Sequence, residues 1–186
     1  MDFDQGEIWS GEFYELSLQL WPRNEDLLHA ILTALWTRPD IEGRYPDRAD
    51  EPDEQTSVDV LELFEGSPIA HGMARLPTGS RVPCCSYVGH SVKRPTLATL
   101  DFSVPCVALD RVLGDNWLYE SSTERSIAGW LADIAATLDK AAPFEVGFVG
   151  RELVVAGLAE DIVEVNPQGY PELPGCSGRL HWVQLA

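Results

Sequence analysis

The chain has 186 residues, of which 45% are hydrophobic and 23% are charged, and its formal net charge at pH 7 is −17. This composition is typical of a globular protein, and a chain of this length can bury a core without a metal or a disulfide to stabilise it. The acidic excess opposes direct binding to DNA or RNA, and no apolar run approaches the roughly 18 residues of a membrane helix. We therefore expect a globular protein that binds neither nucleic acid nor a membrane.

The negative charge is concentrated in the first third of the chain. Residues 1–65 hold 17 of the 30 acidic residues but only 4 of the 13 basic ones. An asymmetric field of this kind steers a cationic partner toward one face of a protein and raises its association rate. The imbalance therefore indicates a basic partner, although the same charges also serve solubility.

The composition also predicts where the protein works. The first ten residues contain three acids and no apolar stretch, so no secretory signal is expected. Cys84 and Cys85 are adjacent, a spacing that fits an unstrained bridge poorly, so we expect all four cysteines to be reduced. The 11 Arg against 2 Lys suit a GC-rich bacterial genome. These features predict a cytoplasmic bacterial protein.

The first two elements follow from periodicity and helix-capping residues. Residues 12–20 alternate between apolar and polar side chains, which is the period of a strand with one buried face. After Pro22, Asn24 can cap a helix whose apolar residues recur at helical spacing and end before Pro39. A strand followed by a helix is therefore expected at the start of the fold.

The next segment, from Pro39 to Thr56, contains three prolines and seven acids. This composition disfavours both a helix and a central strand, so it predicts an exposed acidic loop at about 39–56. Strand-like segments then follow at 57–64, 69–76, 81–88 and 96–104. The turn-forming sequences EGSP and PTGS separate the first three, so a meander of hairpins is expected.

A second helix is predicted from Ser121 to a stop at Pro143, because Ser121 and Glu124 have capping-box spacing before a helical apolar pattern. For the rest of the chain, we predict strands at 144–149 and 179–185, either a strand or a short helix at 153–165, and a loop from Pro167 to Gly178. The whole chain, residues 1–186, is predicted to be one α+β domain, with two amphipathic helices packed on a mostly antiparallel sheet.

Several of these segments resemble those of an uncharacterised family of single-domain bacterial proteins. They are FYELSLQL, the first helix ending in LW, ATLDFSVP, ERSIAGWLADIA and PFEVGFVGREL. The resemblance implies the fold and a bacterial origin, and no activity is assigned to that family. In size, acidity and α+β pattern the chain is also similar to immunity proteins that neutralise antibacterial toxins.

A repeated Cys-x4-His spacing is the main candidate for a metal site. Cys85 with His90, and Cys176 with His181, would together supply two thiolates and two imidazoles to a tetrahedral zinc ion. Positions five apart on a strand point to opposite faces, so each pair would need a bend. Because neither spacing is an established zinc motif, no metal and no cofactor are predicted, and zinc remains an alternative.

A thiol nucleophile is the second chemical alternative. Cys84 or Cys85, paired with His90 or His71, is the combination that could provide a thiol and a base. No local signature orients such a pair, and a cysteine in a strand is more often an inert part of the core. We therefore predict no catalytic cysteine.

Carboxylates on the predicted strands could provide an acid and a base. The candidates are Asp59, Glu62 and Asp101. Their alternation with apolar residues favours a solvated strand face instead. The sequence also contains no G-x-S-x-G, no phosphate-binding glycine motif and no EF-hand spacing. No catalytic residue is predicted.

The acidic surface is left as the main candidate for function. The residues expected to contact a partner are Asp40, Glu42, Tyr45, Asp47, Asp50, Glu51, Asp53 and Glu54. Carboxylates steer a basic partner, while an aromatic side chain supplies an anchor. The first hypothesis is a non-catalytic inhibitor or immunity protein that occludes a basic partner such as a toxin enzyme. The alternatives are a zinc- or thiol-dependent enzyme and a small-molecule-binding domain.

Overall fold

The fold is built on one mostly antiparallel sheet. A computed structural model of the chain describes residues 6–20, 24–48, 50–60, 69–90, 97–153, 172–173 and 175–183. The strands in these residues form one eight-stranded sheet in the order β2-β3-β4-β5-β1-β6-β8-β7. They are β1 (Phe13–Leu20), β2 (Ile41–Tyr45), β3 (Ile69–Arg75), β4 (Arg81–His90), β5 (Ala98–Pro105), β6 (Val146–Arg151), β7 (Glu172–Leu173) and β8 (Arg179–Val183). Only β6 and β8 pair in parallel, so the predicted α+β class with a mostly antiparallel sheet is confirmed.

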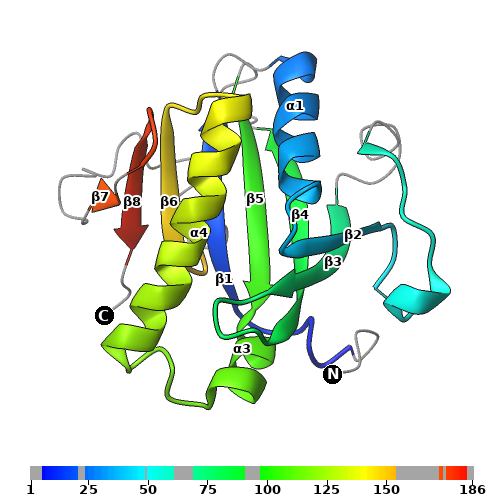
Figure 1. Cartoon of the computed structure of the whole chain (residues 1–186), viewed down its shortest axis with the longest axis vertical. Coiled ribbons are helices and arrows are strands. Elements are labelled where there is room, and N and C mark those ends of the chain that lie inside the picture. The colour runs from blue at the N-terminus through cyan, green and yellow to red at the C-terminus, as the bar shows by residue number, and fades with distance from the viewer. Residues whose placement is uncertain are drawn as a thin grey trace.

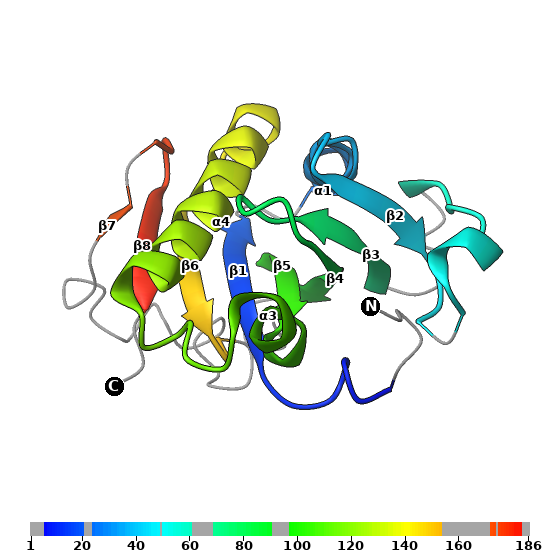
Figure 2. The same cartoon turned by 60° about the horizontal axis from the view of Figure 1, so that its bottom comes forward.

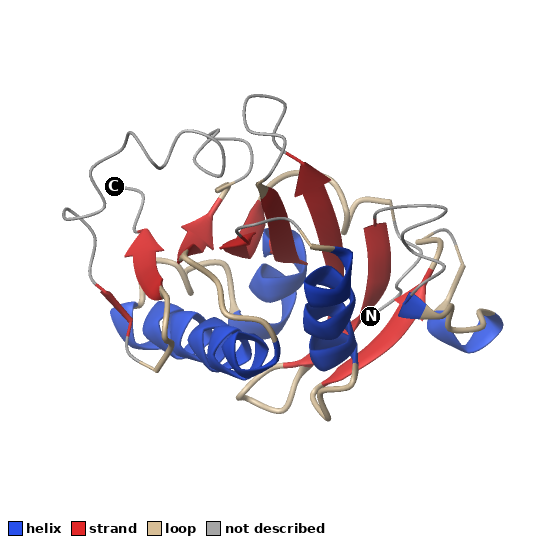
Figure 3. Ribbon diagram, turned by 90° about the horizontal axis from the view of Figure 1, so that it is seen from above, coloured by secondary structure: helices blue, strands red, loops and turns tan. Residues whose placement is uncertain are grey.

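Two long helices cover one face of this sheet. They are α1 (Glu25–Trp36) and α4 (Ser121–Ala141), which lie in front of the strands in Figure 1 and on one side of them in Figure 3. A shorter helix, α3 (Cys106–Leu113), lies at the end of β5, as Figure 2 shows. The Asn24 side chain caps α1 as predicted, because its Oδ1 accepts a hydrogen bond of 2.8 Å from the Asp26 amide.

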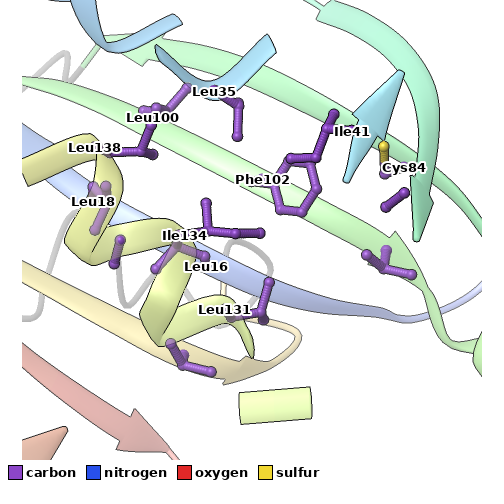
Figure 4. Close-up of a cluster of buried hydrophobic side chains, with 14 of the residues drawn as sticks. Leu16, Leu18, Leu35, Ile41, Cys84, Leu100, Phe102, Leu131, Ile134 and Leu138 are labelled. Atoms are coloured by element: carbon purple, nitrogen blue, oxygen red, sulfur yellow. The ribbon is translucent and has the colours of Figure 1, made fainter. Parts of the chain in front are cut away.

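The main core lies between these helices and the sheet. Leu16 and Leu18 of β1 point toward α4, where Leu131 and Ile134 meet them, and Phe102 of β5 lies beside them (Figure 4). All five side chains are 0–1% exposed. Full burial of one such side chain contributes roughly 1.5–3 kcal/mol, so this layer fixes the central strands against α4.

The predicted acidic loop at 39–56 is only partly a loop. Residues Ile41–Tyr45 form β2, which is the edge strand of the sheet beside β3. Residues Pro52–Glu54 form a single turn of 3-10 helix. The expectation of a continuous loop from 39 to 56 was therefore wrong for its first half.

A bulge explains why the alternating pattern does not reveal β2. The pairing of β2 with β3 shifts between Gly43 and Tyr45, where Gly43 has a φ of 134° and Arg44 a φ of 77°. A Cβ at Gly43 would lie 2.6 Å from the Cα of Gly72 on β3, so only glycine allows this close approach. The contact that defines the strand is thus made by residues far away in the sequence.

Two features of the helices also differ from the prediction. Helix α4 has Glu120 at its N-cap, one residue before the predicted Ser121, and Glu120 makes no side-chain cap hydrogen bond. Helix Cys106–Leu113 was not predicted. The signal for it was present, since Gly114 ends the helix with a φ of 90°, as glycine often does.

Most of the other predicted strands are present in the sheet. The expectations at 12–20, 69–76, 81–88, 96–104, 144–149 and 179–185 correspond to β1, β3, β4, β5, β6 and β8 and are confirmed within the described residues, which omit 96, 184 and 185. No strand occurs at 57–60, and residues 61–64 lie outside the described residues. Most of 153–165 also lies outside them. Within the predicted loop at 167–178, residues 172–173 form β7.

Candidate functional site

The face of the sheet opposite α1 and α4 carries buried polar side chains along its two central strands, β1 and β5. We call this set the polar face: Glu15, Ser17, Gln19, Thr99, Asp101 and Ser103. Each of the six is only 1–8% exposed. The single buried face predicted for β1 was therefore wrong, because the polar side of this strand is buried as well. Alternation alone cannot distinguish a polar side chain in water from one in a buried network.

Hydroxyl groups and carboxyl groups satisfy each other on the polar face. The register places Ser17 opposite Asp101 and Glu15 opposite Ser103. Ser17 Oγ donates a hydrogen bond of 2.5 Å to Asp101 Oδ1, and Ser103 Oγ donates one of 3.0 Å to Glu15 Oε1. Thr99 Oγ1 lies 3.5 Å from the second oxygen of Asp101. The network therefore ties β1 to β5 on the face that lacks the long helices.

Asp101 is a strongly perturbed carboxyl of this network. Burial raises its pKa to about 7, the hydrogen bond from Ser17 opposes this rise, and repulsion from Glu15 adds to it. The prediction that Asp101 lies on a solvated strand face was wrong, since the residue is 3% exposed. The carboxyl can thus hold a proton near neutral pH.

The cysteines are poor nucleophiles in these surroundings. Burial raises the pKa of Cys85 to about 12 and holds the pKa of Cys84 well above its ordinary value. His71 lies opposite Cys85 across β3 and β4, and burial lowers the pKa of its imidazole. A catalytic thiol needs a depressed pKa, and these thiols have the opposite shift.

The four candidate zinc ligands cannot meet at one ion. Cys85 is on β4 and His181 is on β8, and three strands separate β4 from β8 in the sheet. At about 4.8 Å between neighbouring strands, this separation is roughly 19 Å. His181 instead stacks on Phe148 with a ring separation of 5.7 Å. In the part of the chain that the structure describes, no three His, Cys, Asp or Glu residues gather as metal ligands.

The second candidate site is the acidic segment that follows the edge strand β2. We call it the acidic edge: Asp47, Asp50, Glu51, Asp53 and Glu54. All of these residues except the partly buried Glu51 are exposed. The Gln55 side chain holds the segment together, because its Nε2 donates a hydrogen bond of 2.6 Å to the Asp50 carbonyl. The acids are therefore displayed on an organised turn.

Three of these acids have no cationic partner among the described residues. Asp50, Asp53 and Glu54 make no ion pair with any Arg or Lys of the described residues. Three exposed carboxylates within five positions produce a concentrated negative potential. The segment can thus attract a cationic surface.

Asp40 has partners within the fold. Its carboxylate accepts hydrogen bonds of 2.9 Å from Arg38 and from Trp130 Nε1. Burial would raise the pKa of Asp40, but the bonds from Arg38 and Trp130 outweigh burial and lower it. Arg38 also pairs with Asp133 of α4, at 3.0 Å. Asp40 therefore joins the end of α1 and the start of β2 to α4.

Glu42 and Tyr45 lie on β2 itself. Glu42 forms an exposed ion pair of 2.7 Å with Arg81 of β4. Tyr45 is partly buried and packs against the core. Of the eight residues predicted to contact a partner, the structure thus brings five together in the acidic edge, while Asp40, Glu42 and Tyr45 make contacts within the sheet and helices.

Comparisons with known proteins identify no relative of this chain. No family model matches the chain, and neither a curated protein nor a solved structure matches it. Among the described residues, no helix has the length and apolar character needed to cross a bilayer.

Proposed function

We propose that this is a non-catalytic cytoplasmic binding protein whose acidic edge engages a basic protein partner. In this proposal it acts as an inhibitor or an immunity protein, which occludes the functional surface of a partner such as a toxin enzyme. The two chemical alternatives are less well supported, because the cysteine thiols have raised pKa values and the Cys/His pairs lie on distant strands.

The observation that carries the proposal is the exposed charge of Asp50, Asp53 and Glu54, which no cation of the described residues neutralises. A protein gains no packing from such a concentration of like charge, which slightly opposes the compact state. Facing a cationic surface, the same charges raise the association rate and disfavour acidic competitors. The rest of the −17 net charge strengthens this preference for a basic partner.

The proposal can be tested with two variants that change the net charge equally. Asp53→Lys/Glu54→Lys reverses two charges of the acidic edge, and Asp115→Lys/Glu145→Lys reverses two exposed charges elsewhere. Each protein is immobilised and used to capture partners from a lysate of its host at low salt, followed by mass spectrometry. A captured enzyme is then assayed with and without the protein.

We expect wild type and the control variant to retain a basic protein that the edge variant loses. We also expect wild type to inhibit that partner's activity. Retention of the same partner by the edge variant would contradict a role for the acidic edge. An active partner in the presence of saturating wild type would contradict inhibition.

A further inference from the structure

Two exposed hydrophobic side chains form a patch on the sheet. Among the described residues, the large hydrophobic side chains that are exposed are Ile69, Tyr87 and Tyr119, at 36%, 40% and 85%. Ile69 and Tyr87 lie directly opposite each other on β3 and β4, where cross-strand Cβ atoms are about 5 Å apart. Tyr119 belongs to the turn before α4. We call Ile69 and Tyr87 the apolar patch.

The Tyr87 ring lies close to a neighbouring glycine. A Cβ at Gly89 would lie 3.1 Å from Cε1 of Tyr87, so the ring lies over the bare backbone of Gly89. A tyrosine side chain has only two rotatable bonds to the ring, so it loses little conformational freedom when a partner covers it. Tyrosines of this kind are frequent anchors of protein interfaces.

The apolar patch lies beside the start of the acidic edge. Strand β2 ends at Tyr45, which is opposite His71, and Ile69 is two residues from His71 on the same face of β3. The acidic edge therefore starts level with Ile69. Burial lowers the pKa of His71, Arg48 adds to this shift and Asp47 opposes it, so the start of the acidic edge lies near the imidazole.

We propose that Ile69 and Tyr87 are the apolar anchor of the interface whose charged rim is the acidic edge. A basic protein partner places an aromatic side chain on the patch, while its Arg and Lys side chains meet Asp50, Asp53 and Glu54. A second copy of this chain fits poorly, because it would bring another net charge of −17 to the same surface. This inference rests on the proposed function.

Two peptides of equal charge distinguish the contribution of the apolar patch to binding from that of the acidic edge. The probes are the peptides RRRRGRRRR and RRRRWRRRR, which differ only at their central residue, and their dissociation constants are measured by fluorescence anisotropy at two salt concentrations. For wild type we expect the peptide with the central tryptophan to bind about fivefold more tightly, since one aromatic contact contributes about this much. The preference should fall to about one in Ile69→Ser/Tyr87→Ser and persist in Tyr119→Ser.

The outcomes distinguish the two proposals. If the preference survives in the patch variant, or is lost equally in Tyr119→Ser, the anchor is wrong even when both peptides depend on the acidic edge. If Asp53→Lys/Glu54→Lys binds both peptides as tightly as its charge-matched control, the proposed function fails instead. A wild-type dimer in sedimentation that Tyr87→Ser dissociates would make a second copy the occupant and overturn the inference. Thermal melts verify folding, and Tyr87→Ser alone is used if the double variant unfolds.

Discussion

The polar face and the acidic edge both carry acidic residues but have opposite environments in the fold. Asp101 is 3% exposed, receives hydrogen bonds from hydroxyl groups and has a pKa of about 7. Asp53 and Glu54 are exposed on a turn and have no cation beside them among the described residues. Acids of the first kind join strands, whereas acids of the second kind are free to meet another molecule.

This comparison shows that the location of a carboxylate matters more than its abundance. The 30 acidic residues cannot be ranked from composition alone. Burial and hydrogen-bond partners separate them into structural and available groups. Substitutions in each group test this division into structural and available acids.

The largest effect is expected from the pH dependence of stability. Because the pKa of Asp101 is higher in the native state than in the unfolded state, the native state holds the extra proton, and the free energy of unfolding falls as pH rises from about 4 to about 7. The free energy of unfolding falls by up to roughly 4 kcal/mol, because the native and unfolded pKa values of Asp101 differ by about three units. Urea unfolding of wild type and Asp101→Asn at pH 4 and pH 8 measures it. If the free energy of unfolding changed equally with pH in both proteins, Asp101 would not have a raised pKa in the native state.

A somewhat smaller effect is expected when an apolar side chain replaces a hydroxyl of the polar face. Ser17→Leu removes the hydrogen bond to Asp101 and inserts a larger side chain at a position that is 1% exposed. We expect a loss of roughly 3 kcal/mol in unfolding free energy. Ser57→Leu, on an exposed segment beyond the acidic edge, is the control and should change stability by less than about 0.5 kcal/mol. Equal costs would show that the two positions do not differ in environment.

Asp40 was predicted to contact a partner but is hydrogen-bonded within the fold, so its substitution tests to which group of acids it belongs. Asp40→Ala leaves Trp130 Nε1 without its acceptor and removes a partner of Arg38, so we expect a loss of about 2 kcal/mol by thermal or urea unfolding. Asp50→Ala is the matched control and should be nearly neutral. If Asp40→Ala were neutral and weakened partner binding instead, Asp40 would belong to the acidic edge.

The smallest effect on stability is expected at the acidic edge itself. Asp53→Lys/Glu54→Lys should change the urea midpoint by less than the equivalent of about 0.5 kcal/mol, because neither side chain has a partner to lose among the described residues. Reduced self-repulsion can make the change slightly stabilising. A loss above about 2 kcal/mol would reveal a structural role for these acids.

The local elements were largely predictable from the sequence. Asn24 and Pro39 delimit α1, and the alternation of residues 12–20 identifies β1. The PTGS sequence predicts the turn between β3 and β4, where Gly79 has a φ of 89° and donates its amide to the Leu76 carbonyl. These signals are readable because capping, periodicity and turn formation involve residues close together in the chain.

The candidate site was predictable only in part. The acidic edge was found because its acids are close together in the sequence, but Asp40 was grouped with them although its hydrogen-bond partner Trp130 is 90 residues away. The apolar patch was missed, since its two residues come from different strands. Exposure of a hydrophobic side chain has no signature in a single sequence.

The sequence by itself determined the α+β class, the first strand, the two long helices and the position of the acidic segment, because these depend on residue type and local spacing. Only the tertiary structure decided that β2 is an edge strand, that Asp101 is buried against Ser17 and that the Cys/His pairs lie on distant strands. The physical reason is that strand order and burial arise from contacts such as Ser17 with Asp101, which are 84 residues apart.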